Sequence, residues 1–308
     1  MMNVNLPKLM CVLAHPDDES LATGGILAKY AASGIRTYLL MATRGERGWT
    51  GAVAEDPGPQ ALGCLRQAEL RAAARVLGLQ EVDFLDYHDG ELDRADPSEV
   101  IAKIVTHLRR VRPDVVVTFD PNGMYGHPDH IAISQLTTTA VLASADPSYQ
   151  GLTRGAPHRV AKLYYRAFLQ GEQEAYEATF GHLVMPVEGV ERRFTAWPGW
   201  AITTRIDTSA HWERVWQAIV CHRSQLPGYQ RLQALPDEAR ATLLATQTYY
   251  RAMSLVNGGR AVEDDLFAGL VGPAQAPQRI PVPNPSLQSR GSFVDTRKTY
   301  AKTHSRAI

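Results

Sequence analysis

Two short segments of the chain concentrate side chains that bind divalent metals and transfer protons. The first reads Ala-His-Pro-Asp-Asp-Glu over residues 14–19, and the second reads Tyr-Gly-His-Pro-Asp-His over residues 125–130. Each segment follows an apolar run with the length of a β-strand. Together they hold enough imidazole and carboxylate groups for one divalent metal, a general acid and a general base. The two segments therefore predict a hydrolase site.

Length and charge limit the classes of partner. The chain has 308 residues, which suits either one elaborated α/β domain or two smaller domains. Lysine plus arginine and aspartate plus glutamate number 32 each, so no net charge attracts nucleic acid or an anionic membrane. We therefore expect a small-molecule partner, with no nucleic acid and no membrane. The oligomeric state stays open.

The cysteines and the N-terminal apolar run bear on the compartment. Cys11, Cys64 and Cys221 are widely spaced and form no CxxC pair, which argues against a disulfide framework and favours a reducing interior. Cys11 lies in an apolar run and is expected to be inert packing. That run, residues 9–14, is too short for a signal peptide or a membrane span. The sequence thus indicates a cytoplasmic protein.

The first half of the chain alternates between strand-like and helix-like patterns. Apolar runs predict strands at 9–14, 35–42, 82–85 and 114–119, and helical spacing predicts helices at 20–33, 63–77 and 97–111. This βαβα order predicts an α/β fold with a mainly parallel sheet flanked by helices. Further expected elements are a helix at 131–143, strands at 162–168 and 201–206, and a helix at 211–221.

The connections are less regular. The long connection at 43–62 is rich in glycine, proline and charge, and we expect it to border the substrate. Residues 170–198 predict a small insertion in a less regular C-terminal portion. We expect one catalytic domain over residues 1–271, with its α/β core at about 1–168. Residues 272–308 have the composition of an extended or disordered tail.

Both segments should meet at one edge of the sheet, because open α/β sheets bind ligands outside the carboxyl ends of their strands. His15 and Asp18 from one loop and His130 from the other would then supply two imidazoles and one carboxylate, with a coordination position open for water. This donor set suits zinc, although ferrous iron, manganese and cobalt are also compatible with it.

The remaining polar side chains of the two segments suggest the proton transfers. Asp17 points away from its neighbour Asp18 and can take a proton from a water whose pKa the metal lowers toward ~7. His127 could be held protonated by Asp129 and act on a developing oxyanion or on the leaving group. Tyr125 could add a hydroxyl donor at the same oxygen.

Simpler interpretations apply to other residues, and to either segment alone. A single His-Pro-Asp segment could be a strand-to-helix cap, so the pairing of two is what favours a site. Arg66 and Glu46 flank the long connection and could bind polar groups of a substrate. His222 follows an expected helix and could reach a pocket, although the cap of a helix C-terminus is the favoured interpretation. The histidines without ligand spacing are expected to be surface or core residues: His88, His107, His158, His182, His211 and His304.

At both segments the chain resembles the LmbE-like, or PIG-L, family of zinc-dependent N-deacetylases. Residues 117–127 look especially similar to the branch of that family that acts in mycothiol metabolism. The resemblance extends over roughly the first half of the chain and is thin afterward, apart from residues 221–225. Met124 and Arg47 depart from that branch, which often has glycine and an acidic residue at these positions.

The resemblance implies a Rossmann-like fold and removal of an acetyl group from an N-acetylglucosamine-containing small molecule. It implies that His15, Asp18 and His130 are the metal ligands and that Asp17 is the general base. It also implies that His127 is the acid partner, that Asp129 orients His127, and that Tyr125 donates to the oxyanion. Arg66 matches a sugar-binding arginine.

Several alternatives stay open. The same site could cleave another amide, as mycothiol S-conjugate amidases do, or deacetylate a bacillithiol precursor or an antibiotic sugar. A nucleotide-dependent oxidoreductase suits the alternating fold, but no GxGxxG follows the first strand. A noncatalytic, metal-stabilised binding module is the non-enzyme alternative.

Overall fold

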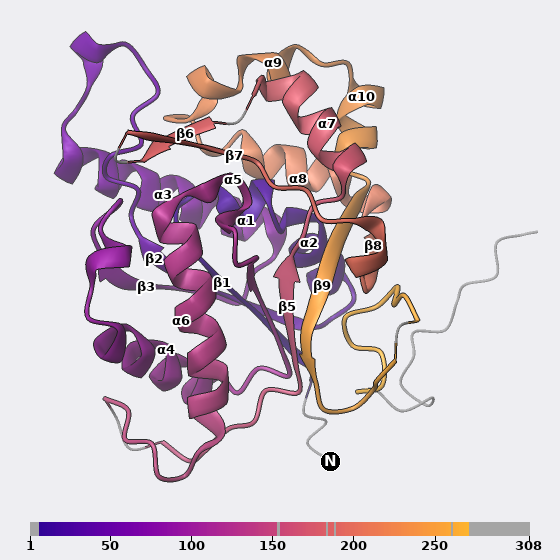
Figure 1. The fold of residues 1–308 in the computed structure, drawn as a ribbon. Helices are drawn as coiled ribbons and strands as arrows, with labels where there is room; N and C mark the ends of the chain where they lie inside the picture. The colour runs from indigo at the N-terminus through magenta and orange to yellow at the C-terminus, as the bar shows by residue number, and fades with distance from the viewer. Residues whose placement is uncertain (1–5, 153–154, 183, 188, 260, 271–308) are drawn as a thin grey trace, which may run out of the picture. The chain divides into compact units, whose positions relative to one another are not determined.

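A seven-stranded sheet with the order β3-β2-β1-β4-β5-β9-β8 forms the centre of the protein in a computed structural model (Figure 1). The structure describes residues 6–152, 155–182, 184–187, 189–259 and 261–270, all of which belong to one compact unit. The tail expected at 272–308 lies outside the described residues. No described helix is both long enough and apolar enough to cross a membrane.

Five neighbouring strands are parallel, and two more extend the sheet in the antiparallel sense. The parallel strands are β1 (Lys8–Leu13), β2 (Arg36–Thr43), β3 (Glu81–Tyr87), β4 (Val115–Phe119) and β5 (Lys162–Arg166). Strand β9 (Thr246–Ser254) pairs antiparallel with β5 on one side and with β8 (Thr204–Asp207) on the other. The predicted mainly parallel α/β fold is confirmed. Strand β9 was not predicted, because its apolar residues form neither a continuous run nor a strict alternation.

Helices cover both faces of the sheet (Figure 1). On one face, α4 (Pro97–Val111) packs with α6 (Pro128–Ala145); on the other lie α2 (Gly24–Ala32), α3 (Pro59–Leu77) and α8 (Trp212–Ile219). The other helices are α1 (Asp18–Leu21), α5 (Gly123–Gly126), α7 (Gln170–Phe180), α9 (Gln230–Ala234) and α10 (Asp237–Leu243). The expected insertion at 170–198 contains α7 and a hairpin of β6 (Val184–Val187) and β7 (Val190–Arg193).

Several predicted boundaries are wrong for identifiable reasons. The helix expected at 20–33 is two helices, and α2 begins at a glycine pair that lies close to other chain segments. A Cβ atom on Gly25 would lie 2.7 Å from the Thr208 side chain, so only glycine allows this approach. Helix α3 begins at Pro59, inside the expected loop, because proline suits the first turn of a helix. Helix α8 ends at Ile219, before the predicted end.

The central strands place the two sequence segments side by side. Strands β1 and β4 pair directly, with Leu9 opposite Val115 and Cys11 opposite Val117. Apart from Lys8, their side chains are fully or almost fully buried, as expected of strands covered on both faces. Cys11 is buried among them, which confirms its packing role. The order of the strands reverses between β1 and β4, and such a switch point is where α/β sheets open a ligand crevice.

A buried polar cluster joins residues near 263 to the sheet. Glu263 accepts hydrogen bonds from Lys162 Nζ at 2.8 Å and from the Tyr164 hydroxyl at 2.7 Å, and Arg251 Nη1 lies 2.7 Å from its carboxylate. Burial alone would raise the pKa of Glu263, but these donors lower it to about 2. The carboxylate therefore stays charged and holds the two cations inside the protein.

Replacing Glu263 with alanine should destabilise the protein strongly, because Lys162 and Arg251 would be left buried without their counter-charge. We expect the free energy of unfolding in urea to fall by about 3 kcal/mol. The neighbouring exposed Asp264 provides the control, since Asp264→Ala should change it by less than about 0.5 kcal/mol. Equal effects of the two variants would contradict this interpretation of the cluster.

Candidate active site

The loops that follow β1 and β4 meet at the carboxyl edge of the sheet. In the first loop, the backbone N–H of His15 donates to Asp18 Oδ2 at 2.7 Å, which fixes the turn into α1. In the second loop, Pro128 occupies the first turn of α6, and this puts His130 at the start of the helix, on the sheet side. His130 stacks on the ring of Phe119 from β4, with centroids 4.0 Å apart.

The three predicted metal ligands come together in this structure. His15 Nδ1 lies 3.2 Å from His130 Nε2 and 3.8 Å from Asp18 Oδ2, while Asp18 Oδ1 lies 3.5 Å from His130 Nε2. Ligand atoms of a tetrahedral zinc ion are about 3.3 Å apart, given bonds of about 2.0–2.1 Å. Two imidazole nitrogens that face each other beside a carboxylate therefore form a donor set that fits a divalent cation.

The other ring nitrogen of His15 is also occupied. His15 Nε2 lies 3.0 Å from Asp129 Oδ2 and 3.1 Å from Asp89 Oδ1. Burial alone would lower the pKa of His15, but these two carboxylates raise it well above its usual value. A carboxylate behind a metal-binding histidine fixes the orientation of the ring. Asp129 is itself held by the backbone N–H groups of Gly90, at 2.7 Å, and Leu92, at 3.1 Å.

The expected pairing of His127 with the Asp129 carboxylate is wrong. Instead, His127 Nδ1 accepts a hydrogen bond of 3.1 Å from the backbone N–H of Asp129, as the N-cap of α6. Burial and the neighbouring His15 lower the pKa of His127 to about 4, so the ring is neutral rather than protonated. Its proton is inferred to lie on Nε2, because Nδ1 accepts. His127 can still act as a donor, but as a neutral one.

Asp17 and Asp18 have separate environments, as predicted. Asp17 Oδ2 accepts hydrogen bonds from the Tyr229 hydroxyl at 2.7 Å and from Arg66 Nη2 at 3.2 Å. Burial raises the pKa of Asp17, and the Arg66 charge opposes this. Burial also raises the pKa of Asp18, to about 7. Two neighbouring carboxylates thus serve two different groups of partners.

The backbone of Asp17 is in an unusual conformation. Its φ is 115°, a value that residues with side chains rarely adopt and that costs about 1–3 kcal/mol. The Asp17 N–H donates to Glu19 Oε2 at 3.0 Å, and Glu19 Oε1 lies 2.7 Å from His222 Nε2. Both Glu19 and His222 are fully buried. The ion pair therefore holds the backbone at the position where it is strained.

His222 was expected to cap a helix, and that prediction is wrong. Helix α8 ends at Ile219, and the following turn carries the His222 ring inward to Glu19. Burial alone would lower the pKa of His222, but Glu19 raises it above 6.5 on balance. The sequence segment around residue 222 is thus part of the site.

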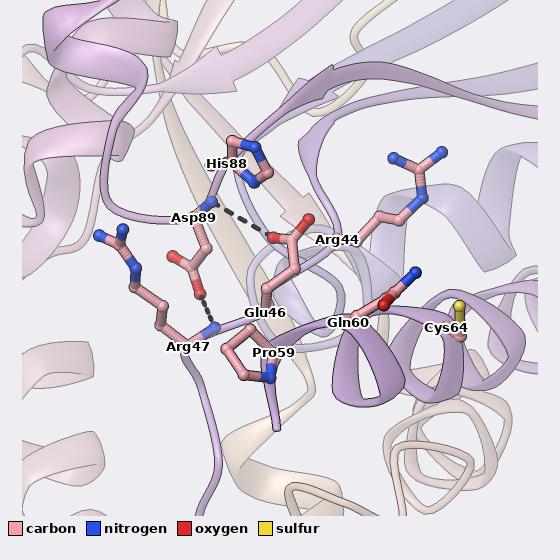
Figure 2. A pocket seen from close by; sticks show the side chains of 9 residues that line it. Arg44, Glu46, Arg47, Pro59, Gln60, Cys64, His88 and Asp89 are labelled. Atoms are coloured by element: carbon pink, nitrogen blue, oxygen red, sulfur yellow. Dashed lines mark hydrogen bonds between the residues drawn. The ribbon is translucent and has the colours of Figure 1, made fainter. Parts of the chain in front are cut away.

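A cavity of about 490 Å³ is lined in part by Asp89, the residue that contacts His15 (Figure 2). Glu46 accepts a hydrogen bond of 3.2 Å from the backbone N–H of Asp89, and Asp89 accepts one of 3.1 Å from the Arg47 N–H. Asp89 therefore connects His15 to the cavity. The cavity is lined by Arg44, Glu46, Arg47, Pro59, Gln60, Gly63, Cys64, His88 and Asp89.

Arg66 and Tyr125 also lie near the predicted ligands. Arg66 is only 3% exposed and donates to the carbonyl oxygens of Gly45, at 2.9 Å, and Pro16 as well as to Asp17. The Tyr125 ring lies 5.3 Å from that of His130, centroid to centroid. Burial raises the pKa of Tyr125 well above its usual value, so its hydroxyl keeps its proton.

Sequence reasoning missed three residues of the site, Asp89, Glu19 and Tyr229, and for His222 it favoured the helix cap over the pocket. Asp89 follows β3 at the same sheet edge, so the rule that united the two segments could have found it. Glu19 belongs to the first segment but was given no role. Nothing in the sequence pattern points to Tyr229, whose contact with Asp17 joins residues 212 positions apart.

Comparison with known proteins identifies related sequences. A family model described as GlcNAc-PI de-N-acetylase, PIG-L, matches residues 10–141. The 1D-myo-inositol 2-acetamido-2-deoxy-alpha-D-glucopyranoside deacetylase of Streptomyces griseus is 35% identical over 92% of this chain and 98% of its own length.

Solved structures with the same fold belong to enzymes named for different reactions. The N,N'-diacetylchitobiose deacetylase from Pyrococcus horikoshii is 21% identical, with a TM-score of 0.55 over 80% of this chain and 84% of its own. The 4-carboxy-2-hydroxymuconate hydratase from Pseudomonas putida is also 21% identical, with a TM-score of 0.57 over 83% of this chain and 100% of its own. The fold alone therefore does not select a reaction.

The variant His222→Gln tests the buried ion pair through pH. The raised pKa of His222 means that its charge stabilises the fold fully below pH 6.5, with the effect lost as pH rises through the folded value. Because the pKa of Glu19 is lowered, its charge contributes fully above pH 4.5, and this contribution is lost as the pH falls through the folded pKa. We expect the variant to lose about 3 kcal/mol of unfolding free energy between pH 4.5 and pH 6.5. The loss should be smaller at higher pH, where His222 of the unaltered protein gives up its charge.

Urea unfolding of both proteins over a series of pH values measures this difference. A loss of stability that stays constant from pH 5 to pH 9 would show that the charge of His222 contributes nothing.

Proposed function

The chain belongs to the PIG-L family, and we propose that it removes the N-acetyl group from a small molecule containing N-acetylglucosamine, with a divalent metal as cofactor. The observation that carries this proposal is the convergence of His15, Asp18 and His130 within 3.8 Å, beside the separately held Asp17. We propose zinc as the metal, because two imidazoles and one carboxylate are a common catalytic zinc set; ferrous iron also suits these donors.

The protein supplies the proton transfers of amide hydrolysis. When bound, the metal would polarise the acetamide carbonyl and lower the pKa of a water molecule. Asp17 takes the proton of that water, and the burial that raises the pKa of its carboxyl makes it a better base. The oxygen of that water attacks the acetamide carbon, Asp17 then passes the proton to the nitrogen as the C–N bond breaks, and the products are the amine and acetate.

His127 and Tyr125 stabilise the negative charge that develops on the acetamide oxygen. His127 donates as a neutral imidazole through Nε2, and the Tyr125 hydroxyl is a second donor at the same face. Asp129 acts through His15, whose ring it orients, rather than through His127.

The cavity beside Asp89 supports a polar, hydroxylated substrate. Glu46 and Asp89 present carboxylates there, which accept hydrogen bonds from sugar hydroxyl groups (Figure 2). We assign Glu46 to substrate binding, as the sequence predicts. We assign Arg66 mainly to holding Asp17, because its described hydrogen bonds go to the protein.

Removal of metal should abolish activity reversibly. Chelation should stop acetate release from N-acetylglucosaminyl-inositol, and added zinc should restore it.

The variant His130→Ala should bind the metal at least about tenfold more weakly, because it removes a ligand. The variant His182→Ala, at an exposed histidine, should match the unaltered protein. Metal affinity should also fall as the pH drops, because protons compete with the metal for His15 and Asp18, whose pKa values are both raised. Full activity in chelator would contradict the proposed cofactor.

The variant Asp17→Asn tests the base. It keeps the shape of the side chain but cannot accept the proton of water, so kcat should fall by about 10²- to 10⁴-fold. Metal content should stay the same, because Asp17 is not among the proposed ligands. Acetate release at the normal rate would reject Asp17 as the base.

A further inference from the structure

The segment at residues 221–229 leaves helix α8 and contacts three parts of the site. His222 pairs with Glu19, as described above. Ser224 donates to both carboxylate oxygens of Glu69 on α3, from its N–H at 2.8 Å and its hydroxyl at 2.6 Å. Gln225 Nε2 donates to the carbonyl oxygen of Gly48 at 2.8 Å. These contacts fix the position of the short 3-10 helix that follows, Leu226–Tyr229.

The two oxygens of the Asp17 carboxylate have different surroundings. Oδ2 accepts hydrogen bonds from the Tyr229 hydroxyl, at 2.7 Å, and from Arg66 Nη2, at 3.2 Å. Within the described residues, no hydrogen bond to Oδ1 occurs. An oxygen that already accepts two donors is the weaker proton acceptor. Oδ1 is therefore the oxygen able to receive a proton.

We propose that Tyr229 is a positioning residue whose hydroxyl anchors Oδ2 of Asp17, so that Oδ1 is directed toward the reacting water. This inference rests on the proposed role of Asp17 as the base. In the step itself, one O–H bond of water breaks, its proton moves to Oδ1, and the hydroxide oxygen attacks the acetamide carbon. Tyr229 exchanges no proton.

Geometry explains why a second donor is needed beside Arg66. The Arg66 guanidinium also donates to the carbonyl oxygens of Gly45 and Pro16, so it restrains the Asp17 backbone and side chain from one side. Rotation of the carboxylate about this one contact would exchange its two oxygens. The Tyr229 hydroxyl is a second fixed point on the same oxygen, and two fixed points define the plane of the carboxylate.

The variant Tyr229→Phe removes this hydroxyl and keeps the ring that packs against the core. We expect kcat to fall roughly 10- to 100-fold with KM, metal content and thermal unfolding midpoint unchanged. Tyr165→Phe is the matched control, since it loses one hydroxyl contact, to Thr138 at 2.8 Å, outside the site. Its kcat should match that of the unaltered protein.

A more electrophilic substrate distinguishes the positioning role from a merely structural one, because a structural role would lower kcat equally with both substrates. An N-trifluoroacetyl group depends less on base-assisted attack than an N-acetyl group. The kcat deficits of Tyr229→Phe and Asp17→Asn should therefore both shrink with the trifluoroacetyl substrate. A deficit of Tyr229→Phe that is the same with both substrates would overturn the inference.

Two further outcomes separate this inference from the proposed function. If Asp17→Asn is inactive while Tyr229→Phe keeps its full kcat, the positioning role fails and the base assignment stands. If Tyr229→Phe raises KM at constant kcat, Tyr229 contacts substrate and the inference is again wrong. If Asp17→Asn is fully active, the proposed base itself fails.

Discussion

The contact between His15 and Asp129 joins the parts of the site that come from different strands. His15 follows β1, Asp129 follows β4, and the Gly90 and Leu92 N–H groups that hold Asp129 follow β3. With Nε2 engaged by the carboxylate, the ring of His15 has its other nitrogen directed at His130. One hydrogen bond therefore orients a ligand and ties three loops together, and the pairing of β1 with β4 makes that bond possible.

The sequence predicted the parts of this protein that depend on local pattern. The parallel half of the sheet and the convergence of His15, Asp18 and His130 followed from apolar runs and from the rule on strand ends. The partners of Asp129 and His222 did not follow, because residues close in sequence do not have to be in contact in the fold. Asp129 lies two residues from His127 but directs its carboxylate at His15, since α6 begins between them. Strand β9 was missed because its burial depends on β5 and β8 rather than on its own composition.

The two consecutive aspartates show how one loop gives similar side chains different tasks. Asp18 starts α1 and faces the imidazoles, whereas Asp17 precedes the helix with a φ of 115° and faces Arg66 and Tyr229. A relaxed backbone at Asp17 would change the direction of its side chain. The buried pair of Glu19 and His222 offsets the cost of that conformation, so the separation of the two carboxylates depends on residues far along the chain.

The residues of the site fall into two groups along the chain. All three donors that suit a cation lie within residues 10–141, the region that the family model matches, whereas His222 and Tyr229 lie outside it. A fragment that ended near residue 141 would therefore keep the three proposed ligands but lose His222 and Tyr229. It would lack the contacts that hold the strained backbone of Asp17 and one oxygen of its carboxylate.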